Sequence, residues 1–315
     1  MKNPLSEKKK KSGLGKRLKI LIRILFGVLI FFGLFYKIGF ERIAESLGRL
    51  NLWALPLAAG LFVLFLGLSS LGSWVLLRAF SRLSFWEFLP CYLPSWALGL
   101  FLPGKLGEVS IVYYLKTRDI TVGRGTAYFL VGKSLNVLAL GMVASTGFFT
   151  FFSFRMAVQL LLLLVVFLGG FISFFLSSLG KTMAKKVLPA KIQENFVGFS
   201  SAFSSYFHAH KGLLCLSLGI KLLGYGCIAV INYFIFSVGL NVQISIIKIL
   251  QISTMETFST LIPISVNGLG IRQALGIYLY GLIGVNAPIV ASSQIIGWVI
   301  IYLFGASVFI LLRPS

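Results

Sequence analysis

Long runs of apolar residues without any charge constrain this chain more than any other feature. Residues 54–77 contain no Asp, Glu, Lys or Arg, and no charged residue occurs between Gln273 and Leu312. A helix needs about 20 predominantly apolar residues to cross the hydrocarbon core of a bilayer. Of the 315 residues only 12% are charged, whereas soluble domains average about a quarter. The chain is therefore predicted to be an all-α polytopic integral membrane protein, which excludes an ordinary soluble enzyme.

We expect about six full spans in a single transmembrane domain, residues 18–315, which follows a basic cytoplasmic tail, residues 1–17. The predicted spans are residues 18–36, 54–77, 126–152, 156–180, 212–238 and 288–312. The last uncharged stretch is too long for one span. Because glycine, asparagine and proline interrupt it at 284–288, it is predicted to hold a short helix, a turn and the final span.

The distribution of Lys and Arg predicts the orientation of these spans. Cytoplasmic loops carry an excess of both residue types. With the N-terminus inside, twenty of the 29 basic residues lie on the cytoplasmic side and five on the outer side. We therefore predict a multi-pass protein of the cytoplasmic (plasma) membrane with both termini in the cytoplasm. The net charge of +21 is interpreted as orientation and attraction to anionic lipid, and no nucleic-acid partner is expected.

Two apolar segments do not fit among the six spans, because each begins and ends on one side of the membrane. Residues 85–115 do so on the cytoplasmic side and residues 245–285 on the outer side. Each is predicted to dip in and return as a re-entrant helical hairpin, or to cross twice as short helices. Corresponding broken segments that enter from opposite faces indicate an inverted repeat with its site near the midplane.

Both segments are interrupted by proline and glycine beside an ionisable residue. The first cluster contains Pro103, Gly104, Lys105, Gly107 and Glu108; the second contains Pro263, Ser265, Asn267, Gly268, Gly270 and Arg272. Irregular backbone at membrane depth is tolerated only where protein buries it or where it lines a wet cavity. Close helix packing would explain the glycines but not Glu108 and Arg272. These clusters are therefore the predicted site.

Ionisable side chains inside apolar segments are candidate binding residues, because each costs about 2.5–3.5 kcal/mol at a helix centre. The predicted substrate-binding residues are Lys105, Glu108, Glu256, Ser265, Asn267 and Arg272, with Lys133 and Asn136 as secondary candidates. The glycines and prolines of the two clusters would supply hairpin-tip backbone. Ser265 and Asn267 could hydrogen-bond a headgroup, or could equally satisfy the backbone of their own turn.

Each charged residue has an expected role. Arg272 is expected in the first turn of a helix, where it could clamp a phosphate together with backbone N–H groups of residues 269–271. Glu108 is expected to begin a helix and to neutralise Lys105 or Arg272, or to titrate, while Glu256 is expected to pair with Arg272. Lys221 is interpreted as a structural residue whose side chain reaches the cytoplasmic surface.

Residues 181–211 carry their own pattern, because Phe196, Phe199, Phe203 and Phe207 recur at three- and four-residue spacing beside several lysines. This pattern is typical of an amphipathic helix lying on the inner leaflet. Packing beneath the helical bundle would produce the same pattern, and both interpretations stay open.

At its two clusters the sequence resembles the flippase-like family typified by the membrane region of lysylphosphatidylglycerol synthase, and the likeness runs from the first span to the last. One family motif, ending in Gly-Glu, is matched by Pro103, Gly107 and Glu108. The other, Pro-x-Ser-x-Gly-Gly-x-Gly-x-Arg-Glu, is matched by Pro263, Ser265, Gly268, Gly270 and Arg272. The resemblance implies lipid handling or translocation. Since 315 residues leave no room for the synthase's aminoacyl-transferase domain, lysine transfer is not expected.

Several positions depart from the family pattern. Asn267 replaces a glycine and Gln273 replaces the glutamate that follows the arginine. The Glu-Arg-x-x-Asp that relatives often carry on the next span is Gly-Lys-Ser-Leu-Asn here, residues 132–136. Three acidic positions of the family pattern are thus neutral in this chain.

The predicted function is translocation of an anionic or phosphate-containing lipid, whose headgroup passes the polar path where the hairpin tips meet. The alternatives are a membrane enzyme that transfers a group to a phospholipid or polyprenyl-linked lipid, in the manner of a glycosyltransferase, and an ion-coupled small-solute transporter. No catalytic residue, metal site or cofactor is expected, because the chain has no nucleotide-binding or metal motif. Membrane lipids are the expected partners, and a separate lipid-modifying enzyme is a further candidate.

Overall fold

The structure is a computed structural model that describes residues 25–177, 198–261 and 268–311, and all regular structure within these ranges is helical. Five of the described helices are long and apolar enough to cross a membrane. They are α3 (Ala54–Leu77), α6 (Val122–Phe151), α7 (Phe154–Leu176), α11 (Lys211–Phe234) and α14 (Ala287–Leu311). A further apolar helix, Leu25–Ile38, is the described part of the predicted first span. The prediction of an all-α polytopic membrane protein is confirmed.

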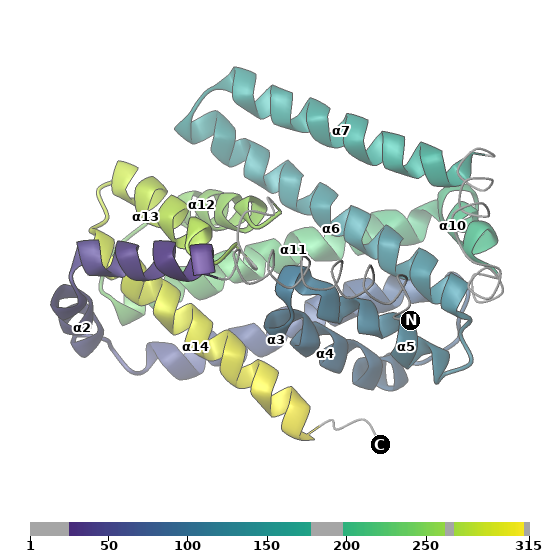
Figure 1. The fold of residues 1–315 in the computed structure, drawn as a ribbon, viewed down its shortest axis with the longest axis horizontal. Coiled ribbons are helices and arrows are strands. Elements are labelled where there is room, and N and C mark those ends of the chain that lie inside the picture. The colour runs from purple at the N-terminus through teal and green to yellow at the C-terminus, as the bar shows by residue number, and fades with distance from the viewer. Residues whose placement is uncertain (1–24, 178–197, 262–267, 312–315) are drawn as a thin grey trace, which may run out of the picture.

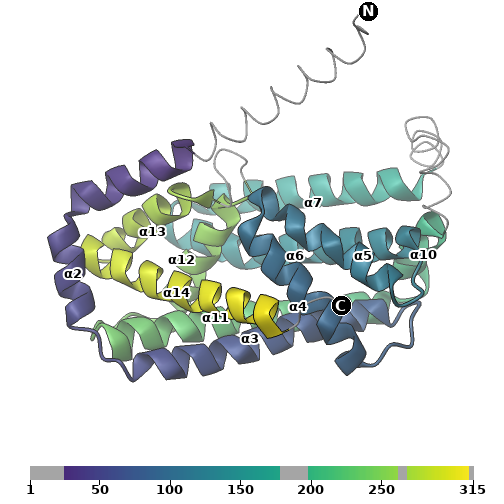
Figure 2. The same ribbon diagram turned by 60° about the horizontal axis from the view of Figure 1, so that its bottom comes forward.

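The long helices lie roughly along the longest axis of the molecule, and Figures 1 and 2 show α3 beside α11 and α6 beside α7. Small residues bring α3 and α11 together, since the Ser217 hydroxyl donates a hydrogen bond of 2.8 Å to the Gly72 carbonyl. The outward face of α7 is apolar as well: Leu162, Val165 and Val166 are 59–72% exposed. A helix whose buried and exposed faces are both apolar is typical of a lipid environment and not of an aqueous one.

The first broken segment consists of α4 (Phe85–Phe101), the 3₁₀ helix η1 (Pro103–Ser110) and α5 (Ile111–Lys116). Ser84 and Glu87 form a capping box that begins α4. Leu102 is extended, as expected before a proline, and this ends α4. The chain then folds back on α4, and Gly107 lies so close to Leu98 that any Cβ would collide with backbone.

The second broken segment consists of α12 (Ile246–Ser259) and α13 (Ile271–Leu282), which follow the short π-helix η2 (Ile235–Gly239) at the end of α11. Gly268 and Gly270 have φ angles of 74° and 81°, a region that only glycine adopts easily. Figures 1 and 2 place this segment in the opposite half of the molecule from α4 and α5. Insertion of the two segments from opposite faces of a bilayer remains a prediction.

Two short helices cover the ends of the molecule: α2 (Phe40–Gly48) at one end and α10 (Phe199–His208) at the other (Figures 1 and 2). In α10, Phe203 and Tyr206 are buried, and the Tyr206 hydroxyl donates a hydrogen bond of 2.8 Å to the Leu76 carbonyl. Of the two interpretations of residues 181–211, packing beneath the bundle therefore describes α10. The preceding part of that stretch, up to residue 197, lies outside the described residues.

Candidate functional site

Glu108 forms an ion pair with Lys133, one of the secondary candidates, across the boundary between η1 and α6. The ion-pair partner of Glu108 is thus Lys133, which the sequence did not single out among the candidate partners Lys105 and Arg272. Glu108 also does not begin a helix: it lies near the end of η1, and α5 starts three residues later, at Ile111. Gly99 on α4 makes room for this carboxylate, because a Cβ there would collide with the Glu108 side chain.

Lys221 lies inside the bundle, which corrects the expectation that its side chain reaches the cytoplasmic surface. Lys221 is 9% exposed, and its ammonium group donates a hydrogen bond of 3.3 Å to the Asn136 side-chain carbonyl. The correction has a simple geometric cause. Lys221 is ten residues into α11, roughly 15 Å along the helix axis. This is about half the thickness of a 30 Å hydrocarbon core, and a lysine side chain cannot span that distance.

Glu108, Lys133 and Lys221 all line one cavity of about 60 Å³ between α3, α4, η1, α6 and α11. We call it the lysine cavity. Its wall also carries Asn136, Ser69 and Tyr92, and a hydrogen bond of 2.6 Å joins the hydroxyls of Ser69 and Tyr92. The cavity therefore combines two ammonium groups, one carboxylate and several neutral hydrogen-bonding groups within an apolar bundle.

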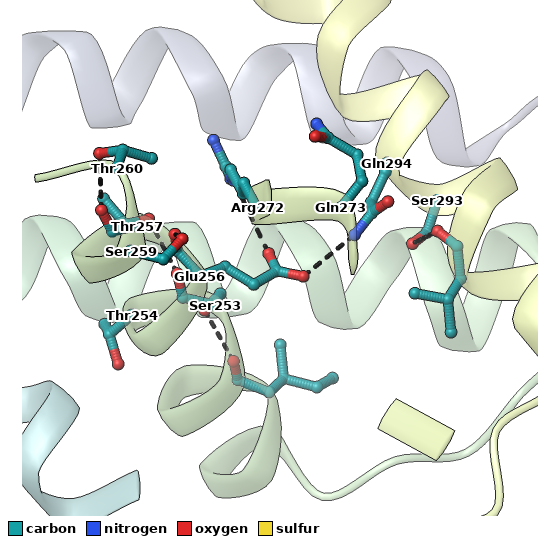
Figure 3. Close-up of polar contacts among 12 residues, drawn as sticks. Ser253, Thr254, Glu256, Thr257, Ser259, Thr260, Arg272, Gln273, Ser293 and Gln294 are labelled. Carbon is teal, nitrogen blue, oxygen red and sulfur yellow. Dashed lines mark hydrogen bonds and ion pairs between the residues drawn. The ribbon is translucent and has the colours of Figure 1, made fainter. Parts of the chain in front are cut away.

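A second cluster of charged side chains, Glu256 and Arg272, lies in the other broken segment (Figure 3). Glu256 on α12 is 5% exposed, and Gln294 of α14 donates a hydrogen bond of 3.1 Å to one of its carboxylate oxygens. Its other oxygen is 3.8 Å from the Arg272 Nε, which confirms the predicted pairing. That distance exceeds the 2.7–3.2 Å of an N–H···O hydrogen bond, so the pair is loose. The Arg272 side chain is 32% exposed and can turn toward another anion.

Arg272 lies in the first turn of α13, as predicted, but the backbone beside it is partly occupied. The Gly270 N–H donates a hydrogen bond of 2.7 Å to the Gln273 side-chain oxygen and is not available to a ligand. The hydroxyls of Ser253, Thr254, Thr257 and Ser259 donate to carbonyls three or four residues earlier in α12. Arg272 is therefore the described group of this segment best placed to bind an anion.

Lys105 of η1 is exposed, and it carries the same charge as Arg272 and Lys133, so that it repels both. The candidate residues thus form two clusters: Glu256 with Arg272 in the second segment, and Glu108 with Lys133 and Lys221 with Asn136 around the lysine cavity. Pro263, Ser265 and Asn267 lie outside the described residues, so their predicted roles stay predictions.

The sequence as a whole matches one known family. Residues 20–308 match the family described as the lysylphosphatidylglycerol synthase TM region. The chain belongs to this family. The match covers nearly the whole chain and extends from the first predicted span into the last helix. No protein with a curated description matches the chain. As a member, the chain is a multi-pass membrane protein related to lipid modification or translocation.

Three residues contribute to the candidate site although the sequence did not indicate this role for them. They are Lys221, Gln294, and Gly276, whose missing Cβ leaves space for Glu256 and Gln294. Lys221 could have been found, because a lysine in the middle of an uncharged span is costly wherever it points. Gly276 carries no such signal, because small residues are common where membrane helices pack, and the sequence does not show which side chain Gln294 contacts. Among the described residues, no cluster of three His, Cys, Asp or Glu side chains could hold a metal ion.

Proposed function

We propose that the protein translocates lipids with an anionic or phosphate-containing headgroup across the cytoplasmic membrane. One observation carries the proposal: each broken segment holds a glutamate–cation pair inside an apolar bundle, Glu108 with Lys133 and Glu256 with Arg272. Together with Lys105 and Lys221, these residues are four cations and two carboxylates, a formal excess of two positive charges. Such an excess favours an anionic ligand.

The polar and apolar surfaces of the bundle would separate the two parts of the lipid. The headgroup would pass the cations Arg272, Lys105, Lys133 and Lys221, where it would exchange water for ammonium and guanidinium donors. The acyl or prenyl chains would stay against the apolar outer faces of the helices, such as α7, and would never enter the protein. Only the polar part of the lipid crosses a barrier in this scheme, so the protein needs a narrow polar path and no large cavity.

Arg272 has the central role in this proposal, because its loose contact with Glu256 leaves it able to exchange one anion for another. A lipid phosphodiester would replace the carboxylate at the guanidinium, and Glu256 would keep its hydrogen bond to Gln294. Movement would be passive or coupled to an ion gradient, with Glu108 or Glu256 as the carboxylate that could carry a proton. We propose no chemical change of the lipid and no catalytic residue.

The test is reconstitution in liposomes that contain a fluorescent phosphatidylglycerol, with translocation measured by dithionite quenching. Wild-type protein should move the lipid, R272A should reduce movement to the protein-free level, and R272K should retain part of it. R49A is the matched control, because Arg49 is exposed in an i,i+4 pair with Glu45. Wild-type rates in R272A would remove Arg272 from the path.

The same vesicles separate the alternatives. A lipid product of changed mass in mass spectrometry would show a group-transfer enzyme in place of a translocator. Accumulation of a soluble solute without lipid movement would show a transporter. The proposed orientation, with both termini in the cytoplasm, is tested separately by fusing a reporter that is active only in the cytoplasm to each end.

A further inference from the structure

We infer that the lysine cavity is a binding site for one phosphate-sized anion, held by Lys221 and Lys133. The inference deepens the proposed function and rests on it only for the source of the anion, since a lipid headgroup and free phosphate share the same chemistry. The binding site itself consists of Lys221, Lys133, Glu108 and Asn136, which all line the cavity.

The first step is the balance of charge in the cavity wall. Lys133 and Lys221 are cationic, and among the described residues that line the cavity only Glu108 is acidic. Glu108 is committed to Lys133, while the hydrogen-bond partner of Lys221 is the neutral amide of Asn136. A buried ammonium without a carboxylate is costly unless something else compensates its charge. The wall therefore has a formal excess of one positive charge, which a monoanion such as a phosphodiester would balance.

The volume of the lysine cavity matches a phosphate group. A cavity of about 60 Å³ is large compared with the 10–15 Å³ that one water molecule needs, so it holds about four to six water-sized groups. A phosphate group, with one phosphorus and four oxygens, fits that space. A glycerol or amino-acid headgroup does not fit in addition to the phosphate, so the rest of the ligand would remain outside the cavity.

The third step is the arrangement of donors. A phosphate needs several hydrogen-bond donors around it, and cationic donors are the strongest. Lys221, Lys133 and the Asn136 amide supply N–H groups, and the Ser69–Tyr92 hydroxyl pair lies in the same wall. The cavity is also accessible, because the side chains of Lys133 and Glu108 are 33% and 22% exposed. An anion entering there would compete with Glu108 for Lys133.

Asn136 provides the sharpest variant. N136D keeps the size of the side chain and places a carboxylate where the Lys221 ammonium now meets an amide oxygen at 3.3 Å. An internal counter-ion would then occupy Lys221 and cancel the excess charge. We expect N136D to fold at least as stably as the wild type and to lose the anion site. K221M removes the cation directly, and K248M, at an exposed lysine of α12, is the matched control.

The experiment measures thermal unfolding of the purified full-length protein in a neutral detergent, with three probes. These are inorganic phosphate, phosphatidylglycerol in mixed micelles, and a neutral glycolipid with the same acyl chains. We expect phosphatidylglycerol to raise the unfolding temperature of the wild type and of K248M by several degrees, and to leave N136D and K221M unchanged. The glycolipid should raise none of the four.

Each outcome decides something. A rise with both phosphate and phosphatidylglycerol supports the site with a free anion as ligand, and a rise with the lipid alone supports it with a lipid headgroup. No rise in the wild type, or an equal rise in N136D and K221M, overturns the inference. Because this readout is binding, it can fail while liposomes still show translocation. Conversely, lipid movement can be absent while the site still binds its anion.

Discussion

The two broken segments are built on one plan but use their charges differently. In each, a glycine of one arm makes room for a glutamate: Gly99 for Glu108 in the first and Gly276 for Glu256 in the second. The two glutamates differ in where their cationic partner lies. Glu108 pairs with Lys133 of α6, which belongs to another part of the bundle, whereas Glu256 meets Arg272 of its own segment.

This difference has a physical consequence. The ion pair of the first segment fixes η1 to a membrane-spanning helix, so moving the segment means breaking a pair inside an apolar bundle. The pair of the second segment travels with it and is already loose at 3.8 Å. The first segment is therefore expected to be the fixed wall of the polar path, and the second segment the part that adjusts to a ligand.

The largest expected effect comes from one closely packed glycine in each segment. A Cβ at Gly107 would collide with the backbone of α4, which cannot move aside, whereas a Cβ at Gly276 would collide with the ends of the Glu256 and Gln294 side chains. G107A should lower the free energy of unfolding by about 3 kcal/mol, the upper end of overpacking costs, and G276A by about 1 kcal/mol.

Thermal unfolding in detergent measures both changes. G169A is the control, because a Cβ at Gly169 meets nothing within 4 Å. An alanine in a helix is about 0.5–1 kcal/mol more favourable than a glycine, so G169A should be neutral or stabilising. Equal losses for G107A and G276A would remove the distinction between a rigid and an adjustable segment.

The next comparison removes each glutamate's charge. E108Q leaves Lys133 without its carboxylate, and we expect a loss of about 2 kcal/mol. This is less than the about 3–5 kcal/mol for breaking a fully buried pair, because the Lys133 side chain is 33% exposed. E256Q should cost at most about 1 kcal/mol, because the loose pair contributes little and a glutamine can still accept the hydrogen bond of Gln294.

Chemical denaturation of both variants in mixed micelles gives the two values. The charge swap E108K with K133E should recover part of the loss in E108Q, since it restores a pair between the same two positions. If E256Q proved the more destabilising variant, the assignment of fixed and adjustable segments would be reversed.

The sequence predicts some of this site for reasons that the structure makes plain. The spans follow from composition alone, because a bilayer demands apolar length. Glu256 and Arg272 could be paired because they flank one break in one segment. Glu108 and Lys133 could not, because their contact depends on how far η1 folds back and on where α6 lies beside it. A compact 3₁₀ turn after Pro103, which the sequence did not indicate, sets both. The burial of Lys221 follows from the helix rise, because ten residues into α11 is too deep for its side chain to reach the surface.

The smallest expected effects concern neutral hydrogen bonds that join each segment to its neighbours. In the first, the Tyr92 and Ser69 hydroxyls share a bond of 2.6 Å; in the second, the Gln251 amide donates to the Thr150 hydroxyl at 2.9 Å. Y92F should cost about 1 kcal/mol, and S69A should add little to it in the double variant, because both remove one bond.

Q251L should be close to neutral, because it also removes a buried side-chain oxygen that has no hydrogen-bond partner in the described structure. The Thr150 hydroxyl keeps its bond of 3.0 Å to the Thr146 carbonyl and is not left unpaired. Unfolding temperatures of Y92F and Q251L, measured side by side, then show whether the first segment is also the more firmly held one where no charge is involved. A larger loss in Q251L would confine the difference between the segments to their ion pairs.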